Sequence, residues 1–145
     1  DYKIMGYMHE GYFSKIDSIS NYYKANMALL NHEIREKLFI DKAPIYTKIR
    51  DNAPVKYGLD SNVKNSLIAD GCIIEGTVEN SILFRGVKVA KGATIKNSIL
   101  MQDTVIGQKC DINYVITDKK VMIGNFRLLT GSQYYPLYVG KGATI

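Results

Sequence analysis

One short phrase recurs along the second half of the sequence and limits the folds available to the chain. Its copies are VKNSLI at 63–68, VENSIL at 78–83, IKNSIL at 95–100 and a degenerate INYVIT at 112–117, with starts 15, 17 and 17 residues apart. Within this period aliphatic residues recur six apart, at Ile68 and Ile74, at Leu83, Val89 and Ile95, and at Leu100, Ile106 and Ile112. A six-residue step matches neither the helical period of about 3.6 nor simple alternation along one long strand.

The six-residue step fits short strands joined by tight turns. One aliphatic side chain per strand then points inward, and Gly or Asn takes the strained turn positions. Three steps form one triangular coil of about 18 residues, and stacked coils bury an aliphatic column that a single coil cannot bury. Residues 63–124 are therefore predicted to form stacked parallel coils with a common interior. The residues predicted inside are Ile74, Val89, Ile95, Ile106 and Ile112.

Two heptapeptides repeat at a longer distance, VAKGATI at 89–95 and VGKGATI at 139–145. We interpret them as the same side of two different coils. Between them NFRLLTGSQYYPLY, at 125–138, breaks the period and is expected to loop out or to cap the coils. The repeat as a whole resembles the hexapeptide left-handed parallel β-helix, whose hand is an exception among crossover connections. The resemblance implies a mainly β fold, with the β-helix domain over residues 61–145.

The first sixty residues follow another pattern. Apolar residues near helical spacing predict one long α-helix near 18–38, with Asp17, Ser18 and Ser20 as candidate N-caps. Residues 41–60 contain two prolines and no period, and are expected to form an extended linker. The chain begins without Met, in the alternating YKIMGYM, and is interpreted as a fragment of a longer protein.

Composition excludes several classes of protein. The net charge is +5, but the 19 basic and 14 acidic residues are interleaved, which indicates a solvated basic surface and no nucleic-acid site. No apolar run reaches about 18 residues, so we expect no membrane segment. Cys72 and Cys110 lack CxxC spacing, which favours two buried, reduced thiols in a cytoplasmic protein over disulfides or a zinc site.

Catalytic motifs are scarce. Hexapeptide β-helices are best known in acyltransferases, in which a coil histidine acts as general base. The only histidines, His9 and His32, both precede the coils, so acyl transfer lacks its base. The sequence also contains no Gly-rich phosphate loop, HExxH motif or Cys/His cluster, and we expect no metal site.

A second set of motifs spans nearly the whole chain in a fixed order: EGYFSKIDSISNYYKANMALL at 10–30, PIYTKIRDNAPVKYG at 44–58, and then the hexads. This set resembles the C-terminal part of the glucose-1-phosphate adenylyltransferase (ADP-glucose pyrophosphorylase) family of glycogen and starch synthesis. The family's Tyr/Trp-x-Ala-Asn-x-x-Leu helix matches at Tyr23, Ala25, Asn26 and Leu29, and its Pro-Ile-Tyr-Thr stretch matches at 44–47. The resemblance implies that residues 1–40 end a nucleotidyltransferase-like domain through a strand, a turn and a helix.

The family's Gly-Tyr-Trp-x-Asp turn is altered in this sequence. Aligning Gly11 and Tyr12 with its first two residues puts Phe13 at the Trp and Lys15 at the Asp, and Asp17 falls at a later Gly. In catalytic members that Asp helps to hold Mg²⁺, whereas an ammonium group repels a cation. The sequence is therefore similar to the GlgD-type, non-catalytic subunits of the family. This implies a fragment with no catalytic residue, no metal and no cofactor of its own.

Assembly and regulation are the functions that this resemblance leaves. It implies a catalytic adenylyltransferase subunit as partner in a homo- or hetero-oligomer, and a sugar phosphate or other anionic effector near basic residues. The candidate effector-binding residues are Lys48, Arg50 and Lys56 in the linker and Arg85 in the coils. Two alternatives stay open: a catalytic subunit of the same enzyme with an unusual turn, and a hexapeptide acyltransferase.

Overall fold

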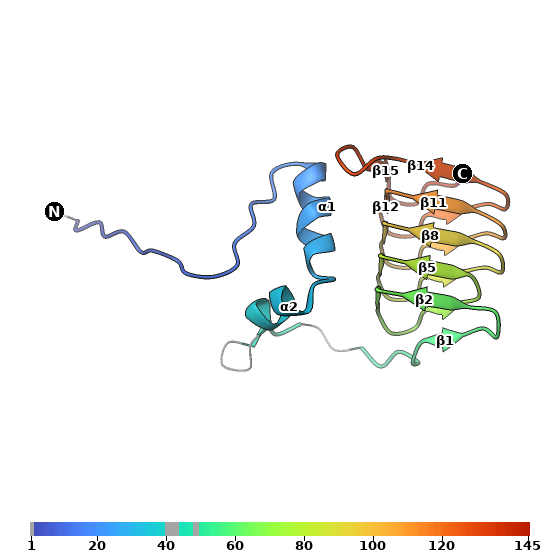
Figure 1. Ribbon diagram of the computed structural model, residues 1–145, viewed down its shortest axis with the longest axis horizontal. Coiled ribbons are helices and arrows are strands. Elements are labelled where there is room, and N and C mark those ends of the chain that lie inside the picture. The colour runs from blue at the N-terminus through green and yellow to red at the C-terminus, as the bar shows by residue number, and fades with distance from the viewer. Residues whose placement is uncertain (1, 40–43, 48–49) are drawn as a thin grey trace.

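The computed structural model of the chain describes residues 2–39, 44–47 and 50–145. Its second half is a mainly β, three-sided parallel solenoid with five strands in each sheet (Figure 1). Sheet A contains β1 (Lys56–Tyr57), β4 (Ile73–Ile74), β7 (Lys88–Val89), β10 (Val105–Ile106) and β13 (Met122–Ile123). Sheet B contains β2 (Asn62–Lys64), β5 (Thr77–Glu79), β8 (Thr94–Lys96), β11 (Asp111–Asn113) and β14 (Leu128–Thr130). Sheet C contains β3 (Leu67–Ile68), β6 (Ile82–Leu83), β9 (Ile99–Leu100), β12 (Val115–Thr117) and β15 (Leu137–Val139).

The hexad residues fill the interior of the solenoid. Each strand pairs in parallel with the strand one coil above or below, so equivalent hexad positions stack directly, as Ile106 does between Val89 and Ile123. The predicted inward residues are buried in one cluster, with exposed fractions of 0–2%: Ile74, Val89, Ile95, Ile106 and Ile112. The prediction of stacked coils with this interior is confirmed.

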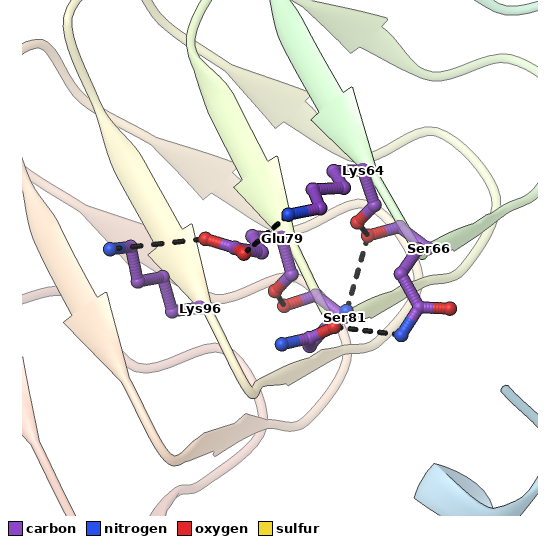
Figure 2. A network of polar contacts seen from close by, with 7 residues as sticks. Lys64, Ser66, Glu79, Ser81 and Lys96 are labelled. Atoms are coloured by element: carbon purple, nitrogen blue, oxygen red, sulfur yellow. Dashed lines mark hydrogen bonds and ion pairs between the residues drawn. The ribbon is translucent and has the colours of Figure 1, made fainter.

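The recurring Asn-Ser pair is explained by the corner between sheets B and C (Figure 2). The asparagine occupies the left-handed region, with φ of 46° at Asn80, a conformation that Asn tolerates better than most residues. The Ser81 hydroxyl donates to the Glu79 carbonyl at 2.7 Å and accepts the Ser98 N–H at 3.1 Å. Each serine thus closes its own corner and supports the next coil, which leaves no buried hydroxyl unpaired there.

The two related heptapeptides lie on different sides of the solenoid. VAKGATI starts in sheet A at Val89, whereas VGKGATI starts in sheet C at Val139 and ends with Thr144 bridged to Met122 of sheet A. The interpretation that they share one side is wrong. All three sides use the same hexad, and both copies have a left-handed Gly at the corner. The heptapeptide sequence therefore predicts a strand followed by a corner, but it does not predict to which of the three sheets the strand belongs.

The segment 125–138 departs from the repeat less than expected. Residues 128–130 form β14 and residues 137–139 form β15, and both strands pair with the coil below. Only residues 132–136 leave the solenoid, at the corner after Gly131.

The shorter first period has a local cause. Between β4 and β5 the corner contains only Glu75 and Gly76, which is tighter than the corresponding corner of the next coil. A Cβ at Gly76 would lie 2.3 Å from the Ala93 carbonyl oxygen, so the two coils approach closely only because this position is glycine.

Two helices precede the solenoid, α1 (Ile19–Ala28) and α2 (His32–Leu38). The prediction of one long helix over 18–38 is wrong, because the Asn31 side chain accepts the Glu33 N–H at 2.8 Å and begins a second helix there. Of the three candidate N-caps, Ser18 caps α1 by accepting the Asn21 N–H at 3.1 Å. Residues 2–17 form no helix or strand, so the alternation at 2–8 forms no strand with any described segment.

Helix α1 lies alongside sheet C (Figure 1). Its Tyr23 is 4% exposed and packs with Ile99 and Ile116, which point outward from β9 and β12. The outer face of sheet C is therefore apolar where the helix covers it. Sheet B instead carries charged side chains outward, such as Glu79 between Lys64 and Lys96 (Figure 2), at ion-pair distances of 3.8 and 3.9 Å.

Candidate functional site

The corner between sheets C and A stacks polar residues from successive coils. The backbone N–H groups that follow this position bond to the carbonyl one coil below, from Gly86 to Asp70 at 3.2 Å and from Asp103 to Arg85 at 3.0 Å. Lys120 bonds in the same way to Gln102 at 2.8 Å. Asp70, Arg85 and Gln102 therefore occupy equivalent positions in three adjacent coils.

Asp70 organises the lower part of this corner. Its carboxylate accepts a hydrogen bond from the Asn52 amide at 2.5 Å and another from Arg85 Nε at 2.9 Å. The pKa of the Asp70 carboxyl is lowered, chiefly by the Asn52 amide; desolvation opposes this, and the hydrogen bond and charge of Arg85 lower the pKa further. Asn52 also donates its N–H to the Arg50 carbonyl at 3.1 Å. This chain of contacts fixes the end of the linker beside the Arg85 coil.

A groove of about 380 Å³ lies beside this corner. It is lined by Thr47, Arg50, Ala69, Phe84, Arg85 and Gln102. Two arginines, a threonine and a glutamine thus border one hollow whose remaining lining residues are apolar, and one of the arginines, Arg85, is also paired with Asp70. Guanidinium groups provide several fixed N–H donors and bind phosphate and carboxylate groups well, so the groove suits an anion of modest size.

The structure brings together two of the four candidate effector residues. Arg50 and Arg85 line the groove, although 35 positions separate them in the sequence. Lys56 lies in β1, is exposed and is not among the groove-lining residues. Lys48 lies outside the described residues. Sequence analysis did not select Gln102, although its position 17 residues after Arg85 equals the repeat length and so placed it in the same column.

The altered turn before α1 is exposed. The Lys15 ammonium lies 3.2 Å from the Asp17 carboxylate, and their side chains are 75% and 45% exposed. Asp17 also accepts a hydrogen bond from the Asn21 amide at 2.6 Å, and these two partners, Asn21 first, lower the pKa of its carboxyl. The Asp17 carboxylate is therefore already paired, with the Lys15 ammonium and with the Asn21 amide.

Other kinds of site find no support in the described residues. No group of three or more His, Cys, Asp or Glu side chains is placed to hold a metal ion within residues 2–39, 44–47 and 50–145. Among the helices that the structure describes, none is long and apolar enough to cross a membrane. Cys72 and Cys110 are buried and unpaired, as predicted, and burial is the main factor that raises the pKa of the Cys72 thiol. His9 and His32 lie before the solenoid and are exposed.

These features define a class of protein: a parallel β-solenoid built from hexapeptide repeats, with a helix packed on one face and a basic groove at one corner. Residues 52–129 match the family model described as GlmU-like, C-terminal hexapeptide, and the chain belongs to that family. The match covers four complete strands or more in each sheet, together with most of the groove.

The most informative relatives are longer proteins. The chain is 47% identical over 139 residues to the glycogen biosynthesis protein GlgD of Bacillus subtilis strain 168, covering 96% of this chain and 40% of the relative. It is 48% identical over 116 residues to GlgD of Geobacillus stearothermophilus, covering 63% of this chain and 34% of the relative. It is 39% identical over 127 residues to the glucose-1-phosphate adenylyltransferase of Acetivibrio thermocellus, covering 86% of this chain and 30% of the relative. The resemblance to GlgD and this adenylyltransferase group is confirmed, and the chain spans 40% or less of each of these proteins.

Proposed function

We propose that this chain is the C-terminal β-helix part of a glucose-1-phosphate adenylyltransferase-type subunit that acts in glycogen biosynthesis in the cytoplasm. Its role is subunit assembly and allosteric regulation, and its partner is a catalytic adenylyltransferase subunit. The observation that carries the proposal is the 47% identity to GlgD over 96% of the chain. In this proposal residues 1–40 end a nucleotidyltransferase-like domain, residues 41–60 link the domains, and the solenoid over 61–145 winds with the left hand of other hexapeptide β-helices.

The turn before α1 supports a subunit without its own catalysis. Lys15 stands where catalytic members carry a metal-binding Asp, and it pairs with the neighbouring carboxylate of Asp17. A cation at this position opposes Mg²⁺ binding, and the paired Asp17 does not replace the missing ligand.

The full-length protein tests this part of the proposal. Purified from a host without its own adenylyltransferase and supplied with excess Mg²⁺, it should form no appreciable ADP-glucose from ATP and glucose 1-phosphate alone. Added to its catalytic partner, it should change the partner's KM or kcat. Lys15→Asp alone should not restore activity, because Phe13 and Asp17 still depart from the family's turn. If the full-length protein without its partner turned over at about 1 s⁻¹, it would instead be a catalytic subunit with an unusual turn.

The groove beside Arg50 and Arg85 supports the regulatory part of the proposal. Its two guanidinium groups would hold an anionic effector such as a sugar phosphate, at the junction between linker and solenoid. Calorimetric titration with glucose 1-phosphate and with inorganic phosphate tests this site. Arg50→Gln should weaken binding at least about fivefold, as expected for loss of one charged hydrogen-bonding partner. Lys88→Gln, which removes an exposed charge on sheet A outside the groove, should leave binding unchanged.

A further inference from the structure

The recurring Asn-Ser pair is interrupted along the corner between sheets B and C. In the lower coils this corner has Asn65, Asn80 and Asn97 in the left-handed region, with φ of 44°, 46° and 47°. The next coil places Tyr114 there, with φ of 54°. A bulky side chain is disfavoured in this conformation, whereas Asn is among the residues that accept it. In the coil above, the same corner has Gly131, followed by the excursion 132–136.

The change from Asn to Tyr at this position also coincides with the end of the stacked corner serines, whose hydroxyls each accept an N–H from the next coil. Val115 follows Tyr114 where a serine follows each asparagine, so this coil contributes no hydroxyl to the corner. The Val115 N–H still bonds to the Ser98 hydroxyl at 3.1 Å, but nothing equivalent is passed to the coil above. Judged by the needs of the solenoid alone, Tyr114 is an unfavourable choice at this corner, whereas the Val115 side chain is buried in the hydrophobic core.

Tyr114 and the excursion 132–136 both contact helix α1. The Tyr114 and Tyr23 rings have centroids 6.3 Å apart and planes inclined at 56°, a favourable tilted arrangement. The Tyr23 hydroxyl donates to the Asn97 carbonyl at 2.7 Å, one coil below. From the excursion, the Tyr134 ring lies 5.9 Å from the Lys24 ammonium, within cation–π range. Consecutive residues of α1, Tyr23 and Lys24, thus contact the two places along this corner where the Asn-Ser pair is replaced.

We propose that Tyr114 is a docking residue for α1. It occupies a corner better suited to Asn because its ring completes an interaction surface on the solenoid, formed with the Asn97 carbonyl and Tyr134. The partner of this surface is α1 itself, through Tyr23 and Lys24. The contact fixes the height at which the helix sits along the solenoid, opposite β9 and β12. This inference does not depend on the proposed function.

The substitution Tyr114→Asn separates the two roles of this position. In hydrogen-exchange mass spectrometry of the full chain, we expect protection of the α1 amides to fall at least about tenfold, because the docked helix opens more often. Protection of the β9 and β12 amides should stay the same or increase, because Asn relieves the strained corner. Tyr114→Phe is the matched control: it keeps the ring and should retain wild-type protection in both regions.

Opposite changes in helix and solenoid distinguish docking from a general structural role. A purely structural Tyr114 would lose protection in both regions when replaced by Asn, and that result would overturn the proposal. Unchanged protection of α1 in Tyr114→Asn would overturn it as well. Failure of this variant to fold would do the same, because the proposal requires the corner to accept Asn at least as well as Tyr.

Discussion

Ile106 offers a direct test of the inward column of sheet A. Its side chain is 0% exposed and lies between Val89 and Ile123 of the neighbouring coils, which are each 2% exposed. The column is continuous, so a change at its centre affects the coils on both sides. Replacing Ile106 by Asp places a carboxylate where the nearest side chains are aliphatic.

The expected loss of stability has two parts. Removing the aliphatic atoms of a buried isoleucine lowers the free energy of unfolding by about 2–5 kcal/mol, as Ile→Ala substitutions do in cores. Burying a polar group without a partner adds at least about 1–3 kcal/mol, even if the carboxyl becomes protonated. The sum is comparable to the whole stability of an ordinary domain, about 5–15 kcal/mol. Ile106→Asp should therefore unfold the solenoid or leave it marginally stable.

Urea denaturation followed by circular dichroism, with calorimetry for Tm, measures the effect. Ile106→Ala should give a cooperative transition with Tm lowered by at least about 8 °C. The matched control is Met122→Asp, which introduces the same carboxylate in the next strand of sheet A at a side chain that is 55% exposed. Its stability should stay within about 0.5 kcal/mol of the wild type.

Two results would refute this reasoning. If Ile106→Asp melts within a degree or two of the wild type, its side chain does not lie in the interior. If Met122→Asp is as destabilising as Ile106→Asp, the alternation between inward and outward positions does not determine burial in this sheet.

Three further predictions concern single positions. Gly76→Ala should lower Tm by several degrees in calorimetry, because its Cβ would lie 2.3 Å from the Ala93 carbonyl oxygen, whereas Gly140→Ala, with no atom within 4 Å of its Cβ, should not. The pKa of Asp70 is lowered in the folded protein, so its carboxylate stabilises the fold at pH values above the ordinary pKa of 3.8, and this contribution is lost as the pH falls through the lowered pKa. Asp70→Asn should therefore lose less stability than the wild type when both are titrated with acid. Burial raises the pKa of Tyr23 from 10.0 to about 12, so docking of α1 should weaken as the pH rises between these values. Tyr23→Phe should reduce that dependence when helix content is followed against pH, and the remainder should come from Tyr22, whose pKa burial also raises.

The sequence predicts the interior of the solenoid well because one side chain per hexad must point inward. Ile74, Ile95 and Ile112 follow directly from that rule. It does not predict which of the three sides a hexad occupies, because the sides are chemically alike. This is why Val139 lies in sheet C when its counterpart Val89 lies in sheet A.

The helical region was harder to predict because local capping competes with periodicity. The apolar spacing continues past residue 30, but the Asn31 side chain satisfies a free N–H at a helix start better than it serves a helix interior. The periodic pattern alone contains no information about that choice.

The candidate site was predictable only in part. Basic character selected Arg50 and Arg85, and their proximity arises from the Asn52–Asp70–Arg85 contacts, which no local pattern reveals. Gln102 carries no charge and was overlooked, although its column followed from the repeat. Recognition of the site therefore needed the stacking of coils as well as residue type.

The equivalence of the three sides restricts how the length of this chain can change during evolution. Inserting one whole hexad would preserve the aliphatic interior but would turn every later residue onto the next face of the solenoid. The outward faces differ sharply, since sheet B carries Glu79 and Lys96 and sheet C carries Ile99 and Ile116. Such an insertion before Tyr114 would rotate the docking surface away from α1. Natural insertions and deletions should therefore comprise complete three-sided coils, corner residues such as those missing beside Gly76, or outward loops such as 132–136.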